Sequence, residues 1–144
     1  MIREADESDI GQLVGFADRY IETSKLARLV APSREEIRDG ILNLIVNGVM
    51  LVADTEGHIR GLLGGLLSHL PYSKAPLACV VYWWVEPEKR SSPLGVRLLE
   101  WFEDWGKARG AEMVTISDMA DDEPRALYCR LGYDLAERSY YKQV

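Results

Sequence analysis

Residues 77–117 read LACVVYWWVEPEKRSSPLGVRLLEWFEDWGKARGAEMVTIS. Leu77 to Val85 is apolar at both alternating sets of positions, which predicts a central strand covered on both faces. The pair Ser92-Pro93 starts a helix, and apolar residues then recur at helical spacing as far as Ala108. Met113 to Ser117 is a short buried strand. Such a strand-helix-strand unit predicts two parallel neighbouring strands with a right-handed crossover.

The chain before this unit predicts a meander preceded by two helices. Val49–Asp54 and Ile59–Leu70 are apolar and β-compatible, and the polar segment between them predicts a hairpin loop. One helix is expected over Ile10–Ile21. A second begins at the capping box Ser33–Glu36 and ends before Gly48. Residues 2–5 form a short first strand.

The chain after residue 117 predicts one more helix and one more strand. The helix runs from about Pro124 to Leu131, and Tyr133 to Val144 alternates as a closing strand. We therefore expect an α/β (α+β) fold in a single domain over residues 1–144. Its mixed central sheet has roughly six to seven strands, with an antiparallel N-terminal meander, a parallel β-α-β crossover and about four helices.

Composition narrows the function classes. A chain of 144 residues with 47% hydrophobic and 28% charged residues is an ordinary globular domain. Its net charge of −6 disfavours nucleic acid as a partner. The apolar runs are shorter than the roughly 20 residues that a membrane helix needs, and the charged start does not resemble a signal peptide. We therefore expect a cytoplasmic protein.

Cysteine and histidine usage gives no sign of a metal or a disulfide. Cys79 and Cys129 lie in a strand-like and a helix-like run, so two reduced thiols are favoured over a bridge. His58 and His69 stand apart from each other and from either cysteine. No metal is expected at such spacing.

Two motifs, together with the order of elements, resemble the GNAT family of acyl-CoA-dependent N-acetyltransferases. In that family a strand ending in Val-x-Pro precedes Arg or Gln, two residues, Gly, one residue, and then Gly or Ala. Here residues 85–95 read VEPEKRSSPLG, and the second motif, LYCRLGY, covers residues 127–133. The resemblance covers nearly the whole chain and implies the GNAT fold, with acetyl-CoA as co-substrate and an amine as acceptor. Pro93 departs from it, because proline stands where the family has its first glycine and offers no N–H.

The loop before the central helix is the predicted coenzyme site. Coenzyme A carries a pyrophosphate, and the backbone N–H groups at a helix N-terminus form an anion site that a nearby arginine strengthens. The alternative is that Ser-Pro only starts a helix. The predicted coenzyme-binding residues are Trp84, Val85, Arg90, Ser91, Ser92, Leu94, Gly95, Val96 and Tyr128.

Tyr128 matches the family tyrosine that lies near the coenzyme sulfur. The resemblance implies a general acid that protonates the departing thiolate, and a phenol with a pKa near 10 holds its proton at neutral pH. The alternative is a half-buried aromatic that packs on the sheet. Asp121 and Pro124 stand where the family often has Asn and Ala.

A carboxylate is the predicted base. An alkyl amine with a pKa near 10.4 is protonated at pH 7, and exposing its lone pair costs about 4.6 kcal/mol. Glu86 is the first candidate and Glu88 the second, because both follow the central strand. The alternative is a pair of solvated loop glutamates. By resemblance, the backbone amide around Val85 polarises the thioester carbonyl.

Two further features leave alternatives open. The acidic residues Asp118, Asp121, Asp122 and Glu123 either cap a helix or attract a cationic amine. Trp83 and Trp84 point to opposite faces of their strand, so one is predicted in the core and the other on the substrate side. The sequence does not distinguish them.

The first functional hypothesis is an N-acetyltransferase that acts by direct attack of a primary amine, in a ternary complex, with Tyr128 and Glu86 as catalytic residues. The acceptor is a small molecule or a protein. The alternative is a GNAT-fold protein, weak or inactive in catalysis, that binds coenzyme A or modulates a protein partner. A nucleic-acid-binding module is disfavoured, and a homodimer stays open.

Overall fold

The computed structural model describes residues 1–117 and 125–144. One sheet has the strand order β1-β2-β3-β4-β5. These strands are β1 (Ile2–Glu4), β2 (Val49–Thr55), β3 (His58–Ser68), β4 (Leu77–Val85) and β5 (Met113–Thr115). None of the helices in the described ranges combines the length and apolar character needed to cross a bilayer.

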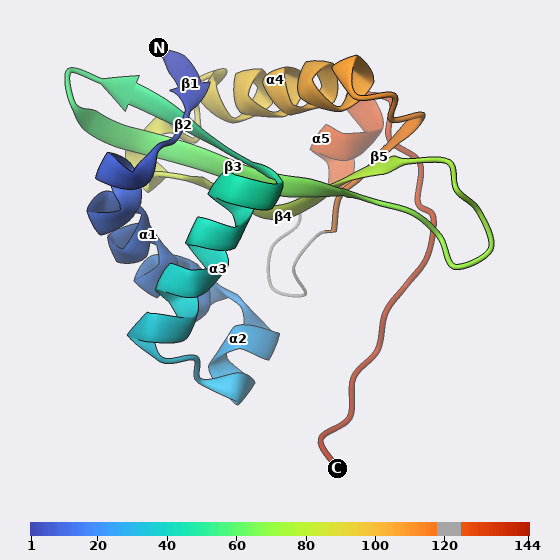
Figure 1. Cartoon of the computed structure of the whole chain (residues 1–144), viewed down its shortest axis with the longest axis horizontal. Helices are drawn as coiled ribbons and strands as arrows, with labels where there is room; N and C mark the ends of the chain where they lie inside the picture. The colour runs from blue at the N-terminus through green and yellow to red at the C-terminus, as the bar shows by residue number, and fades with distance from the viewer. Residues whose placement is uncertain (118–124) are drawn as a thin grey trace.

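Helices cover both faces of this sheet (Figure 1). On one side lie α1 (Ile10–Thr23), α2 (Lys25–Val30) and α3 (Arg34–Asn47). On the other side lies α4 (Leu94–Ala108), with the short α5 (Arg125–Arg130) beside β5. Two 3-10 turns, η1 (Glu7–Asp9) and η2 (Pro87–Lys89), lead into α1 and toward α4.

Two hydrophobic clusters fill the space between the sheet and its helices. Val49 and Leu51 of β2 pack in the cluster under α4, whereas Met50 and Val52 pack in the cluster under α1 and α3. The end of β4 divides in the same way, because Val85 belongs to the first cluster and Trp84 to the second. The prediction for β4 is therefore confirmed at the ends of the strand, whereas Val81 in its middle is 39% exposed.

The predicted meander and crossover are confirmed. Strands β1 to β4 pair antiparallel in sequence order, and β4 pairs parallel with β5 after α4. The parallel ladder is short, since it runs only from Leu77↔Met113 to Cys79↔Thr115. On its other edge β4 pairs with β3 as far as Gly61↔Val85. Within residues 1–117 and 125–144, residues 80–85 of β4 therefore have a strand neighbour on one side only.

Two glycines let α4 approach the sheet closely. A Cβ atom on Gly65 would lie 2.4 Å from Phe102 Cε2, and one on Gly106 would lie 2.8 Å from Ala78 Cβ. Phe102 is fully buried at this contact. Glycine at these positions thus sets the depth at which the crossover helix sits.

An arginine-carboxylate network holds the amino end of the chain to the sheet. The Arg3 guanidinium contacts Asp9 Oδ2 at 2.8 Å and Asp54 Oδ2 at 2.9 Å. These hydrogen bonds lower the pKa of both carboxyl groups and raise the pKa of Arg3. Asp9 is the one charged residue in the buried core of the described chain.

The predicted closing strand, residues 133–144, is wrong, and the sheet has five strands rather than six to seven. This segment leaves α5 and runs away from the sheet (Figure 1). Neither of its alternating sets is consistently apolar, so it has no face to bury against a strand. Its start is attached to α4, because the Tyr133 hydroxyl donates to Glu103 Oε1 at 2.7 Å. Burial, reinforced by that bond, raises the pKa of Tyr133.

Three local predictions need correction. Strand β5 ends at Thr115 and is not buried, since Met113 is 53% exposed beside an edge that no described strand covers. The helix α2 was not predicted, and α1 to α5 make five helices rather than four. The six residues of α2 are too few to give a periodic signal in the sequence. Its cap residue is Ser24, whose side chain accepts a hydrogen bond from Ala27 N. Pro93 is the cap of α4 rather than its first residue.

Candidate active site

The open edge of β4 is the centre of the candidate site. Glu86 N donates to Arg60 O of β3 at 3.0 Å, and successive residues of a strand turn their polar groups to alternate edges. The amides of Val85 and Trp83 therefore point away from β3, toward the gap beyond β5. Arg90 Nε donates to Val85 O at 3.0 Å from that side. The Val85 amide thus lies where the sequence analysis predicted a donor to a thioester carbonyl.

Tyr128 spans the gap between the diverging strands. Its ring stacks on Trp83 of β4, with centroids 6.0 Å apart and an interplanar angle of 24°. Its hydroxyl donates to the carbonyl of Ser117, just beyond β5, at 3.4 Å. A phenol at this place is aligned with the edge that carries the Val85 amide. The predicted acid and the predicted carbonyl donor therefore lie at the same opening.

The amino end of α4 supplies fewer amides than predicted. Ser92 N donates to Lys89 O at 3.0 Å, and Leu94 N donates to Ser92 Oγ at 3.4 Å, so both are used within the loop. The first hydrogen bond of the helix runs from Arg97 N to Pro93 O. Ser91, Gly95 and Val96 keep amides that no described residue accepts from. These three are the amides of the predicted set that stay open to an anion, and the anion site itself stays a prediction.

Arg90 lies back on the strand that precedes it. Its guanidinium carbon is 4.5 Å from the centroid of the Trp84 ring, a cation-π contact, while Nε binds Val85 O. Arg90 is exposed otherwise. The side chain of Trp84 belongs to the face of β4 that α1 and α3 cover, so the predicted coenzyme residue Trp84 presents its indole to the opposite side from α4.

Trp83 is the site residue that the sequence analysis did not assign. Its Nε1 is buried without a hydrogen-bond partner in the described chain, and a Cβ on Gly95 would lie 3.7 Å from it. A buried N–H left unpaired costs about 1–3 kcal/mol, so this indole is a polar group that the packing of α4 leaves unsatisfied. The sequence predicts that Trp83 and Trp84 lie on opposite faces of β4. Only the packing of α4 shows that Trp83 is the one beside the amino end of that helix.

The two candidate bases differ in their surroundings. Glu86 continues the face of β4 that carries Tyr82 and Trp84, because it lies at the same parity. Its Oε2 accepts from Arg60 Nη1 at 3.2 Å, and its side chain is 16% exposed. Glu88 is exposed in η2. Glu86 is thus the less exposed of the two, and its Oε1 has no partner among the described residues, but which of them acts as the base stays a prediction.

The acidic cluster lies outside the described residues. Asp118, Asp121, Asp122 and Glu123 all fall there, and so does Pro124. Both interpretations of the cluster stay predictions. The two cysteines are free thiols, with Cys79 half-buried on β4 and Cys129 exposed on α5.

Comparison with solved structures shows the fold. The chain aligns with a transcriptional regulator from Bacillus halodurans C-125 (TM-score 0.79, 20% identity, 100% of this chain and 99% of that one). It aligns with the aminoglycoside N-acetyltransferase AAC(6')-Iy in complex with CoA (0.82, 12%, 100% and 93%). It also aligns with a predicted acetyltransferase with acetyl-CoA from Clostridium acetobutylicum (0.78, 17%, 99% and 95%).

Comparison of the sequence with known families gives the relationship. A search of curated proteins found no match. The model of the acetyltransferase (GNAT) family matches residues 20–133, which contain the open edge of β4, the tip of α4 and Tyr128. The chain therefore belongs to the GNAT acetyltransferase family.

Proposed function

We propose that this protein transfers the acetyl group of acetyl-CoA to a primary amine by direct attack in a ternary complex. The observation that carries the proposal is the open edge of β4, which brings the Val85 amide, the tip of α4 and Tyr128 to one gap. Family membership supports acetyl transfer. The similar structures solved with CoA or acetyl-CoA support the co-substrate.

Acetyl-CoA supplies a thioester and a pyrophosphate, and the residues present fit both. The amides of Ser91, Gly95 and Val96 would hold the pyrophosphate at the amino end of α4. The Val85 amide would donate to the thioester oxygen and stabilise the negative charge that develops there.

Two side chains would move the protons. Glu86 Oε1 takes a proton from the ammonium group, and the amine nitrogen then bonds to the carbonyl carbon. As the C–S bond breaks, the Tyr128 hydroxyl gives its proton to the departing sulfur. The products are an amide and the free thiol. The nitrogen gives its second proton to the Tyr128 oxygen, and Glu86 releases the first to water, so both residues end as they began and each turnover releases one proton.

A thiol-release assay with Tyr128→Phe tests the proposal. Loss of a positioned acid lowers rates by about 10²- to 10⁴-fold, so we expect kcat to fall at least about 100-fold. The KM for acetyl-CoA should change by less than about threefold. Tyr72→Phe is the matched control, because Tyr72 is 84% exposed in a distant loop. Unchanged turnover in Tyr128→Phe would remove the acid from the mechanism.

A second candidate function is coenzyme A binding without transfer, either alone or to modulate a protein partner. It is favoured by the loop geometry, since Pro93 has no N–H and the Ser92 and Leu94 amides are already bonded. Calorimetry with acetyl-CoA separates the two. Micromolar binding with no thiol release from any amine would support this candidate, and absence of binding would contradict both.

A further inference from the structure

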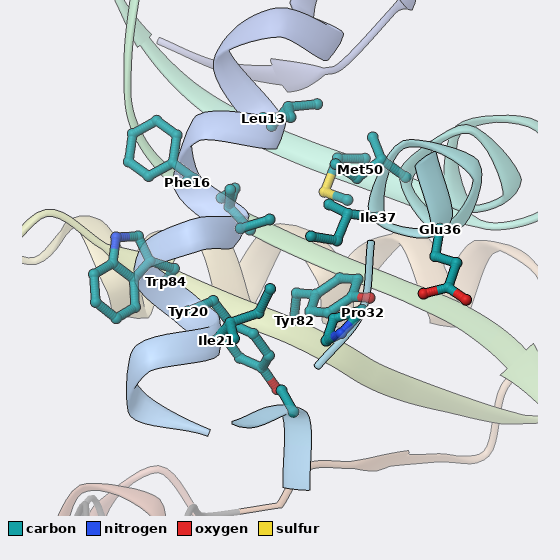
Figure 2. A pocket seen from close by; sticks show the side chains of 14 residues that line it. Leu13, Phe16, Tyr20, Ile21, Pro32, Glu36, Ile37, Met50, Tyr82 and Trp84 are labelled. Atoms are coloured by element: carbon teal, nitrogen blue, oxygen red, sulfur yellow. The ribbon is translucent and has the colours of Figure 1, made fainter. Parts of the chain in front are cut away.

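A cavity of about 140 Å³ lies on the face of β4 opposite α4. Figure 2 shows its side chains converging from α1, α3 and the sheet. The residues that matter for its chemistry are Phe16, Tyr20, Ile37, Met50, Tyr82 and Trp84.

The size of the cavity corresponds to a single ring. An engineered cavity of about 150 Å³ lined by aliphatic and aromatic side chains stays dry and binds benzene. Here four of the walls are aromatic, and Tyr20 meets Tyr82 edge-to-face with centroids 5.2 Å apart. Aromatic walls in such arrangements favour another ring at their faces and edges. Burial raises the pKa of Tyr20 and Tyr82, so both stay neutral phenols.

The cavity borders the candidate site through Trp84. This indole is a wall of the cavity and also carries the Arg90 guanidinium, which is bonded to Val85 O at the open edge. Glu86 is the next residue on the same face of β4, about 7 Å along the strand from Trp84. Phe16 lines both the cavity and the hollow that holds Glu86. A ligand can therefore fill the cavity while its polar end reaches the carboxylate.

The charges on the described residues that line the cavity disfavour an acceptor with several cationic groups inside it. The one carboxylate at the cavity wall is Glu36, and its Oε2 already accepts from Ser33 N at 2.8 Å in the capping box of α3. An ammonium group placed among the remaining walls would be buried without a partner, which is strongly unfavourable. Glu86 is the carboxylate at the far end of this face, so the surface suits one positive charge at one end of an apolar body.

We propose that the acceptor is an arylalkylamine or a similar amine with one ring-sized apolar body, which this cavity binds. The inference rests on the proposed function, because it names the acceptor of that transfer. The strand spacing of about 7 Å matches a ring joined to its amine by about two or three methylene groups. A primary amine of this kind would place its nitrogen at Glu86 and its ring against Trp84 and Phe16.

The test compares acceptors in the thiol-release assay with acetyl-CoA saturating. We expect kcat/KM for 2-phenylethylamine to exceed that for ethylamine by about 30-fold, since the ring is buried on binding. An aminoglycoside and spermidine should be poorer than 2-phenylethylamine. Faster transfer to either polycation would overturn the inference and leave the proposed function intact.

A cavity-filling variant tests whether the preference for 2-phenylethylamine over ethylamine comes from this cavity. Ala17 lines the cavity on α1, so Ala17→Phe should lower kcat/KM for 2-phenylethylamine at least about tenfold. The ratio between 2-phenylethylamine and ethylamine should fall toward one. Ala108→Phe, at an exposed position of α4, is the matched control. If Ala17→Phe does not fold, Ile37→Ala replaces it and should shift preference toward a naphthyl-bearing amine. An unchanged ratio in a folded variant would contradict the inference.

Calorimetry with 2-phenylethylamine in the absence of acetyl-CoA separates the two proposals. Binding that Ala17→Phe abolishes, combined with no thiol release from any amine, would support the ring site and overturn acetyl transfer. Thiol release from other amines, with no binding of 2-phenylethylamine at millimolar concentration, would overturn the ring site alone.

Discussion

The two ends of β4 differ in how they are paired. Residues Leu77 to Cys79 have β3 on one edge and β5 on the other, whereas residues 80–85 have β3 alone. The first end lies in the buried core beneath α4, where Ala78 meets Gly106. The second end leaves backbone amides and two indole N–H groups without partners in the described chain. One strand is therefore paired on both edges at one end and has unpaired polar groups at the other.

A glycine-to-alanine change at the paired end should have the largest effect. A Cβ on Gly65 would lie 2.4 Å from Phe102 and 2.6 Å from Cys79 O, where neither backbone nor buried ring can move freely. We expect Gly65→Ala to lower the free energy of unfolding by about 3 kcal/mol in urea titrations. Gly11→Ala is the control, because no atom lies within 4 Å of its Cβ position. Equal stability of the two variants would contradict this account of α4 packing.

At the open end, the large effect should be on activity. Glu86→Gln should lower kcat/KM at pH 7 by about 100-fold, because the amine then loses its proton acceptor. The defect should shrink as pH rises toward the amine pKa of about 10.4, where the acceptor is already neutral. Glu112→Gln, an exposed glutamate beside β5, is the control. A defect that stays constant with pH would argue that Glu86 positions the amine rather than deprotonating it.

The Arg3–Asp9 ion pair beside β1 should make the free energy of unfolding depend on pH in the acid range. Arg3 lowers the pKa of Asp9 below its ordinary value of about 3.9, so the native carboxylate contributes stability that is fully present above that value. The contribution is lost as pH falls toward the native pKa. We expect Asp9→Asn to lower the free energy of unfolding by about 2 kcal/mol at pH 7, with a weaker decline between about pH 5 and 2.

Acid titrations of both proteins by circular dichroism measure this difference. If the wild-type chain and Asp9→Asn decline in parallel, the carboxylate contributes nothing and the ion pair is neutral for stability.

Gly95→Ala, at the amino end of α4 beside the open end of β4, should have the smallest effect on the free energy of unfolding. A Cβ on Gly95 would lie 3.4 Å from Trp83 and 3.5 Å from Val85, at ordinary contact distances. Alanine also favours the helix over glycine, so the free energy of unfolding should change by less than about 1 kcal/mol. A loss comparable to that of Gly65→Ala would show that α4 packs as tightly at its tip as at Phe102.

Local sequence signals predicted most of the scaffold. The apolar positions of β2 to β4, the crossover helix and the capping box Ser33–Glu36 all appear in the structure. These features depend on neighbours in the chain, which is why periodicity and capping residues report them. The prediction of a closing strand over residues 133–144 was wrong because it depends on contacts that are not local. Its alternation from Tyr133 is compatible with a strand, but a strand also needs a partner edge, which no local pattern supplies.

The candidate site was predicted in its residues but not in its arrangement. The sequence marked Tyr128, Glu86 and the loop before α4, and the structure brings Tyr128 against Trp83 at the open edge. It ranked Glu86 before Glu88 as the base, but it could not show the contact of Glu86 with Arg60, which depends on the pairing of β3 with β4. It could not show that Arg90 lies on Trp84, since that contact depends on how the loop folds back.

The order of elements and the chemistry-bearing residues are encoded in the chain itself, because hydrophobic periodicity, caps and short motifs are local. The point at which β4 and β5 separate, the face that each tryptophan occupies and the ring-sized cavity under α1 arise only from packing. Each of them depends on contacts between residues far apart in sequence, such as Gly65 with Phe102 and Tyr20 with Tyr82. The proposed reaction rests on the first set, and the proposed choice of acceptor rests on the second.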